Sequence, residues 1–297
     1  MPAFFTHDSL GVKNYKKLEQ KKLKHIIKEH RKAYALGTLG PDIFFYYFPD
    51  IIMKDKKPAS VMHEKHAQLF FENMLKRAEL FSSRNKMIAY AYIAGFIGHY
   101  ELDVHCHPYV YSVTESDEPY QQSGEHFALE AAMDLYCSYE YLHRIPTELD
   151  QRKIIAITKQ EKRVISTLLA DAYNVTYHLP KQSRLSIRIK LQFVRTVIFL
   201  LEDRKGWKEK IWTGFEKIIF GYPVTAPLFI NNNSYEYTVE DWYQFHELWR
   251  EALTEYGKLM PYLERYIIQK GDKRTVRREL LNQIGNHSYH TGKIMNS

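Results

Sequence analysis

The chain has 297 residues, 45% of them hydrophobic, so it can build one large domain or two smaller ones and is not a disordered polypeptide. Its 42 Lys and Arg residues outnumber its 35 Asp and Glu residues, and the formal charge of +7 favours anionic partners such as phosphates or acidic lipid headgroups. Cys106 and Cys137 are too few for a disulfide framework, so we expect a reducing compartment.

The first residues, MPAFFTHDSLGVKNYKKLEQ, lack the charged leader, apolar run and cleavage site of a secretory signal, so we expect a cytoplasmic protein. The most apolar stretch, from Met87 to Gly98, is about a dozen residues long. Because a bilayer-spanning helix needs about 20 residues, this stretch predicts a buried helix and no transmembrane segment.

Apolar residues at helical spacing dominate the chain. Tyr15, Leu18, Ile26 and Ile27 give one apolar face to a Lys-rich segment that ends near Gly37. Further helices are predicted over residues 61–81, 85–105, 125–143, 150–174, 184–202, 239–268 and 274–284. Since no run alternates for long enough to form a sheet, we predict an all-α fold, a multi-helix bundle with additional C-terminal helices.

One boundary is predicted near the middle of the chain. Thr147 is followed three residues later by Asp150, a pattern typical of a capped helix start, which places a boundary near Pro146. We therefore predict a helical core over residues 1–145 and a helical C-terminal region over residues 146–297 packed on it. Residues 206–237 are the least regular part and predict a long loop with short helical pieces.

Two pairs of potential metal ligands repeat one spacing. His99 and Asp103, and then His126 and Glu130, are four positions apart, so each imidazole and its carboxylate point from one helical face. One such pair alone is more often an exposed pair or a hydrogen-bonded core histidine, but two pairs together with His107 favour a metal site. Imidazole and carboxylate ligands together suit zinc.

The helix that carries His99 is predicted to stop near Pro108, because proline disfavours helical geometry at the residue before it. His107 would then act from a helix end, whereas His105 falls on a different helical face and Cys106 is expected to be a packed thiol. The histidines after residue 130 have no matching carboxylate pattern, so the chemistry is expected in the first half of the chain.

Further imidazoles and a carboxylate precede these pairs. The ordered set of a near-terminal His, a Pro-Asp, a lone His, HxxxD, HP and HxxxE resembles the bacterial zinc-dependent phospholipase C family, which is related to the trinuclear-zinc single-strand nucleases. The similarity covers roughly residues 1–145. It implies an all-helical catalytic part whose zinc ligands are His7, Asp42, His63, His99, Asp103, His107, His126 and Glu130.

The chain also departs from that family. His66 lies three positions beyond His63 on the same predicted helix face and could replace it as a ligand. Family members use an amino-terminal tryptophan as a ligand, whereas this chain begins Met1-Pro2, so we expect two or three zinc ions. The family's toxins carry a C-terminal β-sandwich, but the second half here is predicted to be helical, so a toxin-like attack on membranes is not expected.

The predicted activity is zinc-dependent hydrolysis of a phosphodiester. By the resemblance, Asp42 is the general base or a bridging ligand, and the substrate is a phospholipid or a small phosphodiester. The aromatic run IFFYYF, residues 43–48, is expected in the core more than in a cleft wall. The Lys-rich helix from Tyr15 to Lys32 allows peripheral contact with an anionic membrane, although a solvated face is the simpler account.

Two other functions fit the same pattern. A single-strand nuclease or nucleotidase would use the same zinc chemistry, and this chain is both basic and aromatic, although nucleic acid is the less favoured partner. A non-catalytic zinc-binding helical protein would keep the ligands for folding. Solvent access to the metals separates these classes, since a catalytic zinc leaves a coordination position for water.

Overall fold

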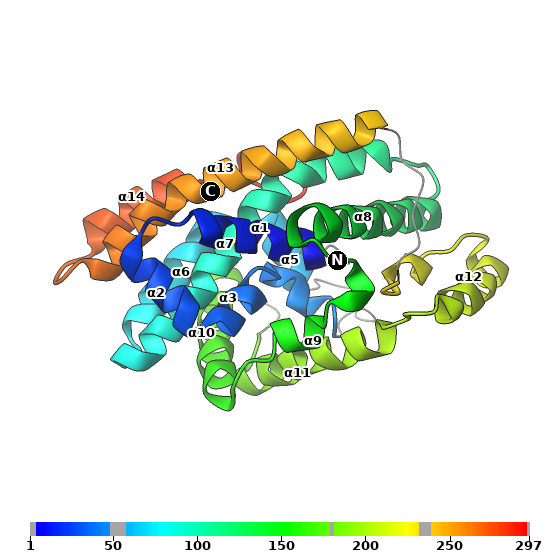
Figure 1. Ribbon diagram of the computed structural model, residues 1–297. Coiled ribbons are helices and arrows are strands. Elements are labelled where there is room, and N and C mark those ends of the chain that lie inside the picture. The colour runs from blue at the N-terminus through cyan, green and yellow to red at the C-terminus, as the bar shows by residue number, and fades with distance from the viewer. Residues whose placement is uncertain (1–3, 48–57, 179–180, 232–238, 296–297) are drawn as a thin grey trace.

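The computed structural model describes residues 4–47, 58–178, 181–231 and 239–295 (Figure 1). Within these ranges every regular element is a helix, and β pairing is confined to two isolated bridges, Glu202 with Ile230 and His287 with Ile294. The all-α prediction is therefore confirmed. No described helix has both the length and the apolarity to cross a bilayer.

The elements comprise α-helices and short 3-10 helices, the latter written η. In chain order they are α1 Phe4–Lys17, α2 Lys21–Glu29, α3 Arg31–Gly37, η1 Gly40–Phe44, α5 Pro58–Glu64, α6 Ala67–Glu79, α7 Ser83–Val113, α8 Pro119–Leu142, η2 Pro146–Glu148, α9 Gln151–Ile154, α10 Lys159–Tyr177, α11 Arg184–Leu201, α12 Trp207–Phe220, η3 Ala226–Leu228, α13 Val239–Ile268 and α14 Arg274–Ile284.

Helix α7 runs through the middle of the molecule, with other helices packed around it (Figure 1). Every residue from Ile88 to Asp103 is buried, which accounts for the apolar stretch in the sequence. Helix α3 crosses α7 where Gly37 meets Gly95, and a Cβ atom at Gly95 would lie 2.1 Å from the carbonyl oxygen of Tyr34. This close crossing carries η1, which directly follows α3, towards the middle of α7.

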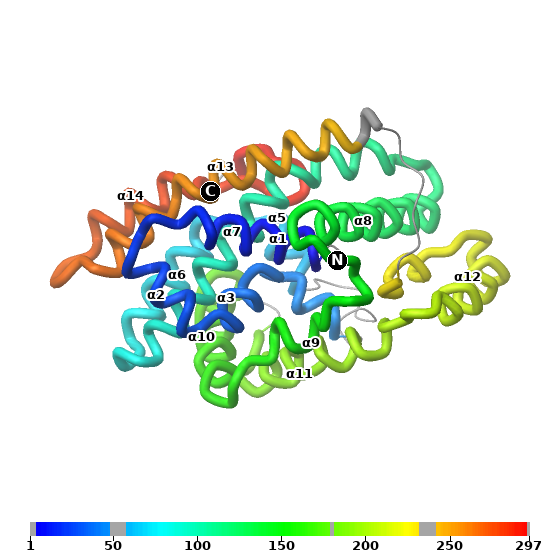
Figure 2. Tube along the Cα trace, in the orientation of Figure 1, coloured from blue at the N-terminus to red at the C-terminus, as the bar shows by residue number. Residues whose placement is uncertain are grey.

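Helix α13, from the far end of the sequence, packs along the same central helix (Figure 2). The Tyr256 hydroxyl donates a hydrogen bond to the carbonyl oxygen of Ala94 at 2.7 Å and lies 2.9 Å from the hydroxyl of Tyr34. Gly98 leaves room for the Tyr256 ring, because a Cβ atom there would lie 2.6 Å from it. The C-terminal region therefore contributes to the packing around α7.

The predicted end of the helix at Pro108 is wrong, because α7 continues through Pro108 to Val113. Proline removes one helical hydrogen bond and costs about 3 kcal/mol in a helix interior. Tyr109 and Val110, the two residues that follow it, are buried, and their burial offsets this cost. His107 thus lies within a helix, one turn beyond Asp103.

Four other predicted elements differ in the structure. The Lys-rich segment predicted to end near Gly37 divides near Leu18 and at His30 into α1, α2 and α3. The predicted helix over residues 61–81 divides at His66, whose φ of 56° is left-handed. The predicted helix over residues 150–174 divides into α9, capped by Asp150, and α10, which begins with a capping box between Thr158 and Glu161. The region predicted as a loop, residues 206–237, contains the 14-residue helix α12.

Candidate metal centre

The eight residues singled out by the sequence lie together in the structure. They come from five elements: His7 from α1, Asp42 from η1, His63 from α5, His99, Asp103 and His107 from α7, and His126 and Glu130 from α8. We call this set the central cluster. Three of its combinations have ligand atoms within 4.8 Å of one another: His7, His99 and Asp103; Asp42, His63 and His99; His107, His126 and Glu130.

Asp103 is the hub of the cluster, and it is only 2% exposed. Its Oδ2 atom lies 2.9 Å from Nε2 of His99 and 3.4 Å from Nε2 of His63. Its Oδ1 atom lies 3.4 Å from Nε2 of His7 and 3.7 Å from Nε2 of His107. One carboxylate therefore has four imidazole nitrogens around it, two of them from its own helix at the preceding and following turns.

Asp42 reaches the cluster from η1. Its Oδ1 atom lies 3.2 Å from Nε2 of His63 and 4.0 Å from Nε2 of His99. Gly40 makes this approach possible, since its φ is +48° and a Cβ atom there would lie 2.2 Å from Cδ2 of His99. The His99 ring is fixed in turn by its Nδ1 atom, 3.1 Å from the carbonyl oxygen of Thr38.

The third combination forms the rim of the cluster. Oε1 of Glu130 lies 3.3 Å from Nε2 of His126 and 3.7 Å from Nε2 of His107. His107 and His126 are half-buried, whereas the other six members of the cluster are buried. The rim is therefore the least buried part of the cluster.

Several buried atoms of the cluster lack a hydrogen-bond partner among the described residues; they include Nδ1 of His7, Nε2 of His99 and Oδ2 of Asp103. Nε2 of His99 and Oδ2 of Asp103 lie 2.9 Å apart, but in an orientation that does not form a hydrogen bond. A buried polar atom without a partner costs about 1–3 kcal/mol. Nitrogen and oxygen ligands converging in this way fit a bound zinc ion, which would supply the missing partner.

The electrostatics of the cluster keep its aspartates and His7 in the forms that bind metals. Burial raises the pKa of Asp42, but the neighbouring His99 and His63 rings outweigh burial and bring the pKa to about 2. In the same way, neighbouring imidazoles hold the pKa of Asp103 well below its usual range. Burial, reinforced by His99, lowers the pKa of His7 to about 3. At neutral pH the carboxylates are ionised and His7 is neutral, the forms in which both bind metals.

His63, not His66, takes part in the cluster. The Nδ1 atom of His63 lies 2.8 Å from the carbonyl oxygen of Ala59, which orients its Nε2 atom towards the two aspartates. His66 lies at the break between α5 and α6, with its ring 6.5 Å from that of Tyr177. Met1 and Pro2 stand where family members have the amino-terminal tryptophan ligand, and both lie outside the described residues.

The sequence missed two residues of the C-terminal tail that cover the cluster. The His290 ring is stacked 5.3 Å from His63 and lies 6.0 Å from His107. The backbone N–H of Tyr289 donates to the carbonyl oxygen of His63 at 3.1 Å, and its ring lies 5.0 Å from the His63 ring. Nothing in their local spacing indicates this role, because their partners are more than 150 residues away in the sequence.

A link between α1 and α8 sets the position of His7. The backbone N–H and the hydroxyl of Thr6 donate to Oδ1 of Asp134 at 2.8 and 2.7 Å. Asp134 is buried one helical turn beyond Glu130, and burial raises its pKa to about 8. This pair holds the turn that carries His7 against the helix that carries the rim.

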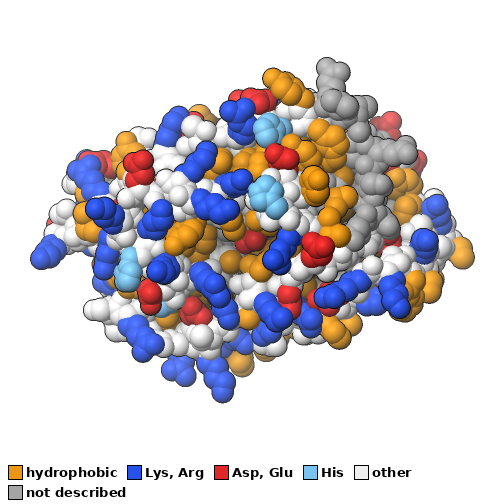
Figure 3. Space-filling model, in the orientation of Figure 1, with side chains coloured by type: hydrophobic (Ala, Val, Ile, Leu, Met, Phe, Trp, Pro, Cys, Tyr) orange, Lys and Arg blue, Asp and Glu red, His pale blue; other side chains and the backbone are white. Residues whose placement is uncertain are grey.

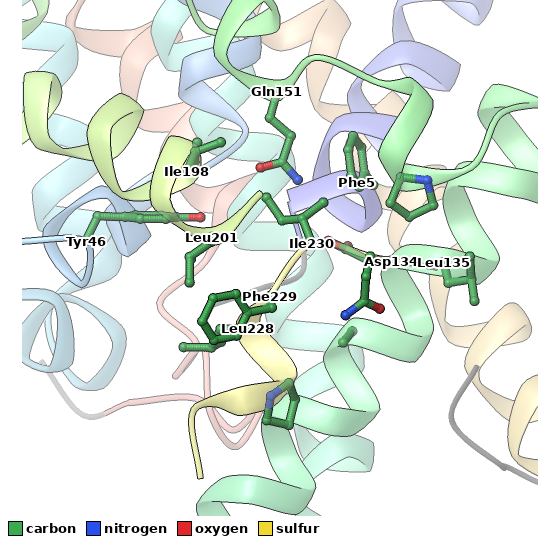
Figure 4. A pocket seen from close by; sticks show the side chains of 14 residues that line it. Phe5, Tyr46, Asp134, Leu135, Gln151, Ile198, Leu201, Leu228, Phe229 and Ile230 are labelled. Atoms are coloured by element: carbon green, nitrogen blue, oxygen red, sulfur yellow. The ribbon is translucent and has the colours of Figure 1, made fainter. Parts of the chain in front are cut away.

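A pocket lies next to this link (Figure 4). Its lining includes Phe5, Tyr46, Asp134, Leu201 and Phe229, from five different parts of the chain. Burial, followed by the negative charges of Asp42, Asp134 and Glu130, raises the pKa of Tyr46. The aromatic run at residues 43–48 is thus mainly core, as predicted, but Tyr46 also lines the pocket; Phe48 lies outside the described residues.

Comparison with known proteins gives one family. The family model described as zinc dependent phospholipase C matches residues 5–179. That range contains every member of the central cluster and extends beyond the boundary predicted near residue 146. No curated protein and no solved structure matches the chain significantly.

Proposed function

The chain belongs to the zinc-dependent phospholipase C family and is therefore a hydrolase, and from this premise we propose that the central cluster hydrolyses a phospholipid or a related phosphodiester. The observation that carries the proposal is the convergence of four imidazoles on the buried carboxylate of Asp103. Folding alone does not require such a group of buried polar side chains, because apolar side chains would fill the same space at a lower cost in free energy.

We assign the eight cluster residues as ligands of two or three zinc ions. His7, His99 and Asp103 form one combination, and His107, His126 and Glu130 form another. Asp42 and His63 complete a third combination with His99, which is therefore shared. Zinc held there would act as a Lewis acid on a phosphoryl oxygen and lower the pKa of a bound water towards about 7.

The protein's own groups would orient the reactants. Asp42, with a pKa of about 2, is ionised at neutral pH and is a weak proton acceptor, so its main contribution is to orient and to bind metal. Its Oδ1 atom lies within 4.0 Å of Nε2 of both His63 and His99, so it could bind the same ion as these two imidazoles. His107 and His126 at the rim are only half-buried, which suits a catalytic site with solvent access better than an enclosed structural site.

Replacement of Asp103 and of His126 by Ala tests the assignment. We expect both variants to lose bound zinc and phosphodiesterase activity on a phosphocholine ester. His126→Ala guards against misfolding of the buried Asp103 variant, because His126 is half-buried at the rim. His105→Ala is the matched control on α7, since the Nδ1 atom of His105 lies 2.7 Å from the carbonyl oxygen of Glu101 and its ring belongs to none of the ligand combinations. Unchanged zinc content and activity in both test variants would refute the assignment.

The substrate class is tested by two parallel assays, on a phosphocholine ester and on single-stranded DNA, each with and without a chelator. Chelator-sensitive hydrolysis of the ester supports the phospholipase C reading. Chelator-sensitive cleavage of DNA alone would favour the nuclease alternative, and zinc binding without either activity would favour the non-catalytic one.

A further inference from the structure

Helix α12 is an amphipathic helix with its apolar face turned towards solvent. It extends from the body of the molecule at the end remote from α2 (Figure 1). Ile218 is 85% exposed and Ile211 is 65% exposed, and Trp207, Phe215 and Ile219 are each more than half exposed. A surface helix normally turns such residues towards the core.

The spacing of these residues defines a continuous face. Positions 207, 211 and 218, and positions 211, 215 and 219, recur at helical intervals and therefore lie along one side of α12. Among the residues of α12, only Glu216 is buried. The helix thus turns a carboxylate towards the protein, and Trp207, Ile211, Phe215, Ile218 and Ile219 away from it.

Polar contacts hold α12 in this orientation. The Glu216 carboxylate accepts hydrogen bonds from the backbone N–H groups of Val224, Thr225 and Ala226 at 2.8 to 3.0 Å. At the other end of the helix, Oδ2 of Asp203 accepts a bond from the backbone N–H of Glu209 at 2.9 Å. The outward apolar face is therefore fixed by the loop after the helix and by the cap before it.

Basic side chains border this face. Lys210 and Lys217 lie on α12 itself, and Arg204 and Lys205 lie just before it. All four are exposed, and within the described part of the chain none of them forms an ion pair. The Glu216 carboxylate is occupied by the loop contacts. Figure 3 shows apolar and basic side chains next to one another at the end of the molecule where α12 lies. The surface is consequently apolar in the middle and positive at its edges.

The end of α12 contacts the helix that carries the rim of the central cluster. The Phe220 ring lies 4.9 Å from the Tyr120 ring, and the Tyr222 hydroxyl donates to Oε1 of Glu125 at 2.5 Å. Glu125 directly precedes His126 in α8. The loop after α12 also lines the pocket shown in Figure 4, through Phe229. The apolar surface is therefore joined, through α8 and this loop, to the proposed active site.

We propose that α12 docks the protein on a bilayer containing anionic phospholipid, with its apolar face in the boundary between headgroups and acyl chains. This inference rests on the proposed function, since a bilayer is where a phospholipid substrate resides. Exposed tryptophan together with lysine and arginine suits that boundary. A second copy of the chain fits less well, because two such faces would bring their basic borders together, whereas anionic headgroups neutralise them.

Sedimentation with vesicles tests the docking. We expect the protein to bind vesicles of phosphatidylcholine with phosphatidylglycerol more tightly than pure phosphatidylcholine, with a blue shift of tryptophan fluorescence. Ile211→Ser with Ile218→Ser should weaken vesicle binding at least about tenfold, since two apolar side chains leave the bilayer. Leu80→Ser is the matched control, because Leu80 is 77% exposed at the end of α6, away from α12. Lys210→Gln with Lys217→Gln should reduce the preference for anionic vesicles and its sensitivity to salt.

Three outcomes would overturn the proposal: absence of vesicle binding, equal loss in the Leu80 variant, or a dimer that the α12 variant converts to a monomer without changing vesicle binding. Hydrolysis of a soluble phosphodiester separates this proposal from the proposed function. The α12 variant should retain that hydrolysis. If the protein hydrolyses the soluble phosphodiester but no variant affects vesicle binding, the docking proposal is refuted and the proposed function is not. If the protein binds vesicles through α12 but hydrolyses nothing, the proposed function is refuted and the docking proposal is not.

Discussion

Substitution of Gly40 by Ala is the most direct perturbation of the geometry that brings η1 to α7. The residue has φ +48°, a left-handed conformation that costs an L-residue about 1–2 kcal/mol. The added Cβ atom would also lie 2.2 Å from Cδ2 and 2.4 Å from Cγ of His99. That ring has no free space, because His99 is fully buried and its Nδ1 atom is held by the carbonyl oxygen of Thr38.

Relief of this clash requires either η1 or the His99 ring to move, which adds about 1–3 kcal/mol of overpacking. We therefore expect Gly40→Ala to lower the free energy of unfolding by about 2–5 kcal/mol. Because His99 belongs to two of the three ligand combinations, the substitution should also weaken zinc binding. Urea denaturation and the zinc content of the purified protein measure the two effects.

Gly214→Ala is the matched control for this experiment. Gly214 lies inside α12, and a Cβ atom there meets nothing within 4 Å. Alanine at this position should increase stability by about 0.5–1 kcal/mol, since it favours the helix. If Gly40→Ala leaves both stability and zinc content unchanged, the close contact between η1 and His99 is not part of the folded protein.

Three further results are expected. Removal of zinc with a chelator should lower the midpoint of unfolding. Added zinc should raise the free energy of unfolding by about 4 kcal/mol per site at a thousandfold excess over Kd, because only the folded cluster binds the ion. Burial, reinforced by Glu255, raises the pKa of Glu101 from 4.5 to about 8, so the wild type loses stability as the pH rises between these values. Glu101→Gln should therefore be more stable than the wild type by roughly 4 kcal/mol at pH 8 and equally stable at pH 4, as measured by urea titration. Glu216→Ala should leave the amides of residues 224–226 without their acceptor and accelerate their hydrogen exchange, with no effect on the amides of α13.

The helical character of the chain was predictable from the sequence, because the spacing of apolar residues is a local property. The stretch from Ile88 to Asp103 is buried on all sides, and its composition indicated this directly. The breaks were harder to predict. Leu18, His66 and Ile155 lie where neighbouring helices change direction, and each break depends on contacts made elsewhere in the chain. Pro108 shows the reverse case, since the buried residues after it keep α7 helical where the local preference would end it.

Helical spacing pointed to His99, Asp103, His107, His126 and Glu130 as candidate metal ligands, whereas the resemblance to the zinc-dependent phospholipase C family added His7, Asp42 and His63. His99, Asp103 and His107 repeat at one helical turn, and their side chains have few other reasons to share a buried face. His290 obeys no such rule, because it reaches His63 only through the fold of the C-terminal tail. The choice of His63 over His66 likewise depended on the break between α5 and α6, which turns the two side chains apart.

The charge of the central cluster connects its geometry to the class of substrate. Asp42, Asp103 and Glu130 are buried carboxylates, whereas the five histidines bring no charge when neutral. Without metal, the cluster offsets this negative charge by holding protons, and the aspartates around His63 raise its pKa to about 10 although burial opposes this. Two divalent ions more than balance three carboxylates and would displace those protons. A site that becomes positive only when loaded with metal, and that is least buried at its rim, would suit an anionic phosphodiester. The buried acids that destabilise the fold would thus determine which substrates the metal-loaded protein attracts.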